Sequence, residues 1–391
     1  MSQTKKQSLS FYYTVVVWGD DYINMLLQVS LRCFLSENNI PGVSNLSTSK
    51  FIFVTTPRDY ETISQSAIFK KLATYLEIVF VELDSKEENV YSRVTRGYEL
   101  ATILATEQQA CVVYLLPDCI ISDGTFLSLY KYAKEGRDVV LLPGPRVIKE
   151  KFLSLVQKLN LADSEPLSLS PRKLAKIGLS CLHDEFDNYN YTRKQFTKWP
   201  HMVTFDIPGE EGLLIRAFHL HPLMVNYTNR ENPIFFNILD TIDAGFIQRN
   251  YKNLNAFVWE QDSDNMILYS MTSEKERHEA GLLWSKSEKT KAIRDMAQCS
   301  LVNELQKINF YNIYKLHVND LNSNWLNIER DSFSMVKLVL TPASCINKRL
   351  CSYIKKGLIK CIPPQLKPFL RCVYWRFKEM LSIYKSKLFI S

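Results

Sequence analysis

Residues 111–124 read CVVYLLPDCIISDG and combine a strand pattern, a turn and the start of a helix. The apolar run from Cys111 to Leu116 is long enough for one buried strand. The chain then turns at Pro117, presents the carboxylate of Asp118, and after a short turn enters a helical pattern from Thr125 to Lys134. In an open α/β sheet, ligands bind outside the carboxyl ends of the strands. Asp118 therefore stands where a ligand is expected.

Strand patterns and helix patterns alternate over the first 160 residues. This alternation is typical of βαβ units and predicts an α/β fold with a mainly parallel, Rossmann-type sheet flanked by helices. A dinucleotide-binding fold would need a glycine-rich turn after the first strand, and the turn Gly19-Asp20-Asp21 has one glycine. Strands are expected at 11–18, 51–55, 77–83, 111–116 and 138–142, and helices at 23–34, 57–73, 91–108, 125–134 and 147–159.

The strand that leads to Asp118 resembles the centre of the GT-A glycosyltransferases, which use nucleotide-diphospho-sugar donors. In that family a buried strand ends in an Asp-x-Asp motif that holds a divalent metal on the diphosphate. This chain has Leu116-Pro117-Asp118 there, so only the last carboxylate is kept. The resemblance covers roughly residues 14–270. It implies a GT-A-like fold, a nucleotide-sugar donor and a Mn or Mg ion with fewer ligands. The alternative role of Asp118 is to form a turn after proline.

The ends of the expected strands supply the candidate donor-binding residues. Asp20 suits a contact to a base or ribose, and Arg93 or Arg96 suits a contact to a phosphate. Each of these side chains could instead cap a helix or form an ion pair on a helix surface. The donor-binding set is Trp18, Gly19, Asp20, Thr55, Arg58, Arg93, Arg96, Pro117 and Asp118.

Two of the six histidines, His219 and His221, stand two positions apart in an apolar run that is typical of a strand. Alternate residues of a strand share a face, and a pair of imidazoles suits Mn, Fe or Zn. Backbone or carboxylate partners could instead satisfy both rings. The family resemblance implies a late histidine or carboxylate as a further metal ligand. We therefore expect a metal site made by Asp118 with His219 or His221.

Sugar transfer with inversion needs a base for the acceptor hydroxyl and a carboxylate near an oxocarbenium-like transition state. The candidates are Glu211, Glu210 and Asp243. The segment Thr241-Ile242-Asp243 resembles one in glycosyltransferase-like bacterial proteins. Two adjacent acids before a glycine are equally typical of a solvated turn, and a turn is also expected at Asp262 and Asp264.

Composition indicates a folded protein without a membrane-spanning helix. The chain has 391 residues, is 46% hydrophobic, and contains no apolar run of the length that crosses a bilayer. The first ten residues are polar and no signal-peptide pattern follows them. Nine scattered cysteines, without a Cys-x-x-Cys pair, are typical of reduced thiols rather than of disulfides or a zinc site. We therefore expect a cytoplasmic protein.

Positive charge is concentrated at the C-terminal end. The whole chain carries +7, whereas residues 345–391 carry +10 and the remainder −3. Apolar residues from Leu370 to Leu388 fall on one helical face with basic residues around them, which is typical of a helix lying on an anionic membrane surface. The alternative is a helix docked on the body. Nucleic acid is not an expected partner, because the body is acidic and has no recognition motif.

These patterns predict one GT-A-like domain at 1–343 and a basic amphipathic tail at 344–391. Within the domain we expect a nucleotide-binding half at 11–150, an acceptor and metal half at 195–270, and a helical part at 271–343. The predicted function is sugar transfer to a saccharide or lipid-linked acceptor, as in surface polysaccharide assembly, at the inner face of the membrane. The alternative is a non-catalytic GT-A-fold binding or scaffold protein at the membrane surface, which the loss of an acid at Leu116 favours.

Overall fold

The computed structural model describes residues 9–43, 46–83, 89–228, 234–237, 241–276, 281–299 and 302–340. The predicted basic tail, residues 344–391, lies outside the described residues. Among the helices that are described, none has both the length and the apolar character needed to cross a membrane.

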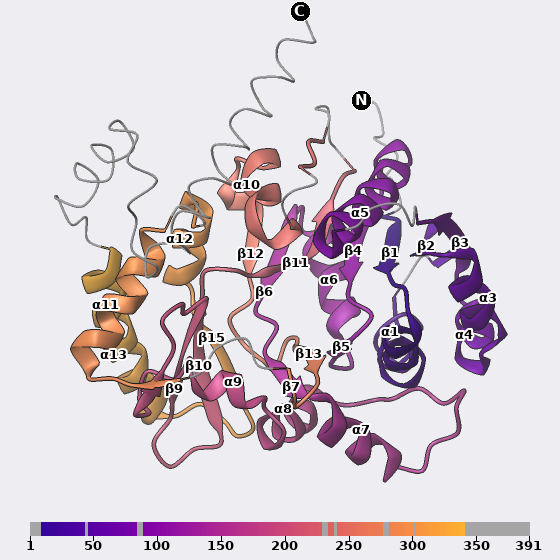
Figure 1. Ribbon diagram of the computed structural model, residues 1–391. Helices are drawn as coiled ribbons and strands as arrows, with labels where there is room; N and C mark the ends of the chain where they lie inside the picture. The colour runs from indigo at the N-terminus through magenta and orange to yellow at the C-terminus, as the bar shows by residue number, and fades with distance from the viewer. Residues whose placement is uncertain are drawn as a thin grey trace, which may run out of the picture.

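Strand and helix segments alternate over the first 157 residues, whereas four strands follow one another between residues 195 and 226. Figure 1 labels these elements. The strands are β1 (Phe11–Val16), β2 (Lys50–Thr55), β3 (Glu77–Glu82), β4 (Cys111–Leu115), β5 (Cys119–Ile121), β6 (Val139–Leu142), β7 (Arg146–Ile148), β8 (Gln195–Phe196), β9 (Met202–Asp206), β10 (Gly212–Ala217), β11 (His221–Asn226), β12 (Phe257–Trp259), β13 (Leu268–Thr272), β14 (Leu282–Leu283) and β15 (Tyr314–His317). The helices are α1 (Asp20–Met25), α2 (Leu31–Phe34), α3 (Pro57–Gln65), α4 (Ala67–Leu72), α5 (Val90–Glu107), α6 (Thr125–Lys134), α7 (Lys149–Gln157), α8 (Pro171–Ser180), α9 (Asp184–Asp187), α10 (Ile247–Asn250), α11 (Lys286–Ala297), α12 (Glu304–Tyr311) and α13 (Ser323–Leu340).

The central sheet has seven strands in the order β12-β6-β11-β4-β1-β2-β3. Strands β3, β2, β1 and β4 pair in parallel, and β12 pairs in parallel with β6. Only β11 runs against its neighbours β4 and β6. Helices cover the sheet on both faces (Figure 1). The predicted α/β fold with a mostly parallel sheet flanked by helices is therefore confirmed.

The two faces of the central strands fill two separate cores. In β1, Tyr13 and Val15 pack into one core, whereas Tyr12 and Val16 pack into the other. Strand β4 alternates in the same way. Alternation of this kind follows from the two-residue period of a strand, and each fully buried large side chain contributes about 1.5–3 kcal/mol. The central strands are thus apolar on both faces, as a sheet covered on both sides requires.

Two three-stranded sheets and one two-stranded pair, β14 with β8, complete the described structure. Strands β15, β10 and β9 form one of them, and α11, α12 and α13 pack near it around a third core. The other sheet has the order β5-β13-β7 and begins just after the end of β4. Strand β13 pairs antiparallel with β5 and parallel with β7. Three segments that are distant in sequence therefore meet beside Asp118.

Two predicted helices differ in detail from the structure. The helix expected at 23–34 begins earlier, at Asp20, and contains a π-helical segment, Leu26–Ser30, between α1 and α2. The helix expected at 57–73 is interrupted at Ser66, whose backbone is extended and whose hydroxyl accepts from the amide of Phe69. A serine that caps a new helix competes with continuation of the old one, which periodicity alone does not reveal.

Gly97 lets helix α5 lie directly on strand β1. A Cβ atom at Gly97 would come 2.6 Å from Cγ1 and 2.8 Å from Cγ2 of Val16. Carbon atoms do not approach this closely, and the β-branched Val16 has little freedom to move away. The contact matters for the site because α5 also carries Arg93 and Tyr98 to the carboxyl ends of the strands.

Gly97→Ala should lower the free energy of unfolding by about 1–3 kcal/mol, because overpacking outweighs the better helix propensity of alanine. Urea denaturation measures this loss. Val16→Ala removes the two nearest of the three atoms that the new methyl group would meet, so the double variant should be less destabilised than the sum of the single variants. Strict additivity of the two losses would show that the contact is unimportant.

Candidate functional site

The candidate site lies where β1, β2 and β4 end and the antiparallel β11 begins. Strand β11 starts at His221, opposite Leu142 at the carboxyl end of β6. Its first residues therefore meet the carboxyl ends of the parallel strands. Buried apolar residues cover both faces of the sheet, so polar groups gather at this edge.

Asp118 follows the end of β4 and is held by contacts from β13. The hydroxyl of Ser270 donates to Oδ2 of Asp118 at 2.6 Å, and the amide of Met271 donates to its carbonyl oxygen at 2.9 Å. On the other side, the Ser30 hydroxyl donates to the carbonyl of Pro117 at 2.9 Å. Burial raises the pKa of the Asp118 carboxyl, and the hydrogen bond from Ser270 offsets only part of this rise. The carboxyl group is therefore fixed in orientation.

His221 and Asp243 come together near the end of β4. His221 Nε2 lies 2.7 Å from the carbonyl oxygen of Tyr114. Because a carbonyl only accepts, Nε2 carries the proton. Burial lowers the pKa of His221, against the hydrogen bond to Tyr114 and the charge of Asp243, so the ring is neutral near pH 7.

Asp243 lies in the first turn of a π-helical segment, Ile242–Phe246, where its carboxylate accepts from the Thr241 hydroxyl. The negative charge of Asp243 also acts on the buried phenol of Tyr98, whose hydroxyl donates to the carbonyl of Leu115 at 2.9 Å. Of the three carboxylates predicted as catalytic candidates, Asp243 is thus the one that lies at the edge where β4 ends.

The prediction that His219 and His221 share one face of a strand was wrong. Strand β10 ends at Ala217, the chain reverses, and only His221 lies in β11. Gln306 Nε2 donates to Nδ1 of His219 at 2.9 Å, and the His219 ring lies 6.0 Å from that of His201. The pKa of His201 is lowered to about 4, mainly by burial and secondly by the charge of the neighbouring His219. His201 was missed from the sequence because its neighbours are distant in the chain.

The predicted donor-binding residues divide into two groups. At the end of β1, the Arg93 guanidinium carbon lies 4.5 Å from the centroid of the Trp18 ring. The amide of Gly19 donates to Oδ2 of Asp59 at 3.2 Å, and a φ of 83° explains the glycine at this position. Trp18, Gly19 and Arg93 thus form one surface at the end of β1, and Asp59 joins them although it was not predicted.

Four other donor-binding candidates lie outside this surface. Thr55 is fully buried in β2, and Arg58 is exposed on α3. Arg96 is exposed on α5 and forms an ion pair with Glu99 on the same helix. Asp20 is exposed in the first turn of α1. The positions of Arg58, Arg96 and Asp20 are typical of helix surfaces, and the ion pair of Arg96 is the alternative role expected for it.

Glu210 and Glu211 lie in the turn between β9 and β10, away from Asp118. The Glu210 carboxylate accepts from Asn322, and the carbonyl of Glu211 accepts from the amide of Val318. This turn precedes β10, whereas His219 follows its other end. Six residues of strand separate the two ends by about 20 Å. The structure therefore does not bring these two acids together with Asp243.

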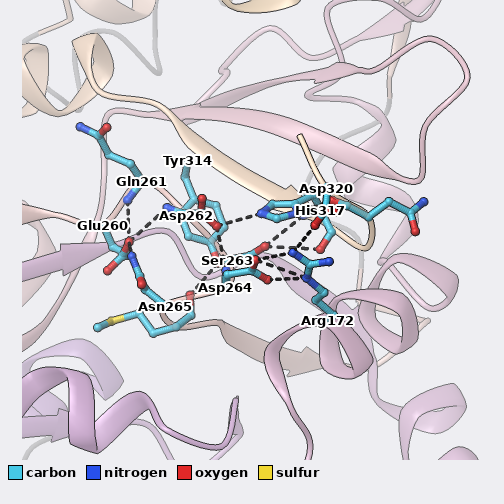
Figure 2. A network of polar contacts seen from close by, with 12 residues as sticks. Arg172, Glu260, Gln261, Asp262, Ser263, Asp264, Asn265, Tyr314, His317 and Asp320 are labelled. Atoms are coloured by element: carbon cyan, nitrogen blue, oxygen red, sulfur yellow. Dashed lines mark hydrogen bonds and ion pairs between the residues drawn. The ribbon is translucent and has the colours of Figure 1, made fainter. Parts of the chain in front are cut away.

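A second polar cluster, shown in Figure 2, contains the group Asp262, Asp264 and His317. Their ligand atoms lie within 4.8 Å of one another, so this group could hold a metal ion. The cluster lies away from Asp118. In the antiparallel pair of β13 with β5, Ser270 is opposite Cys119 and Leu268 is opposite Ile121. The chain before Leu268, which contains Asp264, therefore lies beyond the end of β5 that is remote from Asp118. Both acids were predicted as turn residues, and no sequence pattern links them with His317, which lies more than fifty residues later.

Existing contacts occupy most of the ligand atoms in this cluster. His317 Nε2 lies 2.8 Å from Asp262 Oδ1, and Nδ1 lies 2.7 Å from the carbonyl of Asn319. Both partners are acceptors, so both ring nitrogens carry protons. Arg172 donates to Asp264 through Nε at 3.0 Å and Nη2 at 2.8 Å. A metal ion would therefore have to displace the His317 proton and the Arg172 contact, and the cluster as it stands is an ion-pair network.

The ion pair accounts for two opposite pKa shifts. Burial lowers the pKa of His317, but the hydrogen bonds to Asp262 and Asn319 outweigh it and raise the pKa overall. The hydrogen bond from His317 is the main cause that lowers the pKa of Asp262. The stabilisation by His317 is complete below its unfolded pKa and is lost as the pH rises through the folded value. The stabilisation by Asp262 is lost at the acid end.

Asp118, His219 and His221 do not form a comparable group of ligands. Among the described residues, the Asp262 cluster is the one in which three such side chains converge. At Asp118, the carboxyl group has a raised pKa and accepts from Ser270, and His221 Nε2 contacts a carbonyl. Leu116 offers no ligand in place of the first acid. The described residues around Asp118 therefore do not fit a divalent metal with three protein ligands.

No protein-family model and no curated protein matches this sequence. Among solved structures, the chain is similar to S. aureus TarS, with 14% identity and a TM-score of 0.33 over 93% of this chain and 47% of the other. It is similar to mouse xyloside xylosyltransferase 1 in its apo form, with 9% identity and a TM-score of 0.26 over 38% and 59%. A Bacillus anthracis protein assigned as a glucose-1-phosphate thymidylyltransferase, in complex with sucrose, has 9% identity and a TM-score of 0.23 over 36% and 57%. This chain thus spans about half the length of each.

Asp262→Asn should remove a pH-dependent part of the stability. The difference in free energy of unfolding between wild type and variant should be about 1 kcal/mol near pH 6, because Asp262 is partly exposed, and should shrink as the pH rises through the folded pKa of His317. Urea denaturation between about pH 5 and pH 9 measures it. Asp331→Asn, at an exposed position of α13, is the matched control and should show no such trend. An equal difference at every pH would contradict the ion pair.

Proposed function

We propose that this protein transfers a sugar from a nucleotide-diphospho-sugar donor to a saccharide or lipid-linked acceptor. The observation that carries the proposal is the position of Asp118, held by Ser270 at the carboxyl end of β4 in a mostly parallel sheet. Ligands of open α/β sheets bind at this edge. The surface made by Trp18, Gly19 and Arg93 lies at the end of the neighbouring strand β1 and suits a nucleoside base or its first phosphate.

In the proposed reaction, Asp243 acts as the base for transfer with inversion. It takes the proton from the acceptor hydroxyl, the hydroxyl oxygen attacks the anomeric carbon, and the bond from that carbon to the diphosphate breaks. The leaving nucleoside diphosphate keeps the electron pair of that bond. The neutral His221 and the phenol of Tyr98 lie within electrostatic reach of Asp243. Asp118 is placed to orient the donor sugar, because its carboxyl is fixed by Ser270.

The basic tail, residues 344–391, gives the second part of the proposal. Its charge of about +10, and the apolar face that its sequence would present as a helix, suit an anionic membrane surface, such as the inner face of the cytoplasmic membrane. A lipid-linked acceptor would be reached from there. Loss of the first acid at Leu116 favours the second candidate, a binding or scaffold protein without catalysis.

Calorimetric titration with UDP-, GDP-, CMP- and dTDP-sugars, with and without Mn²⁺, tests the proposed donor. Release of nucleoside diphosphate in the presence of acceptor then measures turnover. Asp243→Asn should bind the donor like wild type but lose about a hundredfold or more in turnover, because it removes the base. Asp118→Asn should lose turnover with the fold intact, and Asp331→Asn should keep it. Donor binding without turnover in wild type would support the alternative of a non-catalytic binding or scaffold protein. Absence of binding to every donor would contradict the proposed donor site.

Deletion of residues 345–391 should release the protein from vesicles that contain anionic lipid. The full chain should also dissociate from them as salt rises, because exposed charges are screened beyond about 8–10 Å at physiological ionic strength. Vesicle sedimentation of both proteins measures binding, with neutral vesicles as the control. Equal binding of the truncated and full chains would contradict a membrane role for the tail.

A further inference from the structure

We propose that the Arg146 guanidinium, rather than a divalent metal ion, neutralises the diphosphate of the donor. This inference rests on the proposed function, since it names the charge partner of the same donor. It starts from the unusual ligand chemistry around Asp118, where Leu116 replaces an acid and no three ligands converge among the described residues. A nucleoside diphosphate cannot leave readily unless its developing charge is stabilised. Another cation must therefore stand near Asp118.

Strand pairing places Arg146 beside Asp118. In the sheet β5-β13-β7, Ser270 pairs with Cys119 on one side and with Arg146 on the other. Paired residues of neighbouring strands project their side chains to the same face. The Ser270 hydroxyl contacts Asp118 Oδ2 at 2.6 Å. The Arg146 side chain therefore leaves the sheet on the face that carries the Asp118 contact.

The electrostatic influence of Arg146 agrees with this placement. Burial raises the pKa of Asp118, and the charge of Arg146 is among the causes that oppose it. Tyr22 lies in α1 and is about half exposed. Burial is the largest cause that raises the pKa of Tyr22, the charge of Asp118 is the second, and the charge of Arg146 again opposes the rise. Asp118, Tyr22 and Arg146 thus lie within electrostatic reach of one another. Glu276 acts on the same two groups with the opposite sign, so the site needs a cation to accept a diphosphate.

A buried carboxylate holds Arg146 in position but leaves most of its donors available. Arg146 Nη1 donates to Glu185 Oε2 at 3.1 Å, and the Glu185 side chain is only 7% exposed, against 41% for Arg146. The Tyr189 hydroxyl approaches the other Glu185 oxygen at 3.4 Å. A guanidinium has five N–H groups, and within the described part of the chain no other contact engages them. Its fork matches two phosphate oxygens at once, and its charge does not depend on pH.

Calorimetric titration of UDP, GDP, ADP and dTDP into the full chain, in buffer with EDTA, tests the inference. At least one of them should bind wild type equally well with EDTA and with added Mn²⁺. Arg146→Ala should weaken that binding about tenfold or more, since it removes hydrogen bonds to a charged group. Arg146→Lys should fall between the two, because lysine keeps the charge but loses the fork. Arg330→Ala removes an exposed arginine from α13 and should bind like wild type.

The outcomes separate this inference from the proposed function. Binding that needs Mn²⁺ would overturn the role of Arg146 and leave the donor site in place. Equal binding by wild type and Arg146→Ala would also overturn it. No binding of any diphosphate, with or without Mn²⁺, would overturn both proposals. If loss of Arg146 leaves the buried Glu185 unpaired and the alanine variant unfolds, the lysine variant decides, with a thermal melt to show that it is folded.

Discussion

The structure depends on the burial of both faces of the central strands. Because β1 and β4 carry apolar side chains into two cores, neither face of the sheet can hold a hydrated ligand. Polar groups gather instead at the carboxyl edge, where the Gly19 turn, Asp118 and His221 lie. The close packing of Gly97 on Val16 belongs to the same constraint, since it seats α5 and its Arg93 against that edge.

The small sheet β5-β13-β7 turns this edge into a candidate site. Strand β13 comes from a segment about 150 residues after Asp118, yet its Ser270 fixes the Asp118 carboxyl and pairs with Arg146 on its other side. One antiparallel and one parallel pairing thus bring an acid, a hydroxyl and a cation together. Leu116 offers no carboxylate beside Asp118, whereas the pairing of Ser270 with Arg146 brings a cation to this part of the sheet.

The cluster around Asp262 shows why grouping of ligand types does not by itself make a site. Two carboxylates and a histidine converge there, but His317 donates hydrogen bonds from both ring nitrogens and Arg172 donates to Asp264. The charges neutralise one another, so the cluster joins α8 to the end of β15 instead of presenting open ligand positions. At Asp118 the opposite holds: fewer acids are present, but Arg146 keeps donors that no described residue uses.

The α/β alternation, the central strands and the position of Asp118 after a strand could be predicted from the sequence alone, because strand and helix periodicities and a turn at Pro117 are local properties. The sequence also named Asp243, Trp18, Gly19 and Arg93. Tertiary contacts were needed to show that Glu210 and Glu211 lie at the far end of β10 and that His219 lies outside the strand of His221. They also brought Ser270 beside Arg146, and His201 beside His219. These relations depend on strand pairing between distant segments, and no local pattern of residues specifies which strand will pair with which.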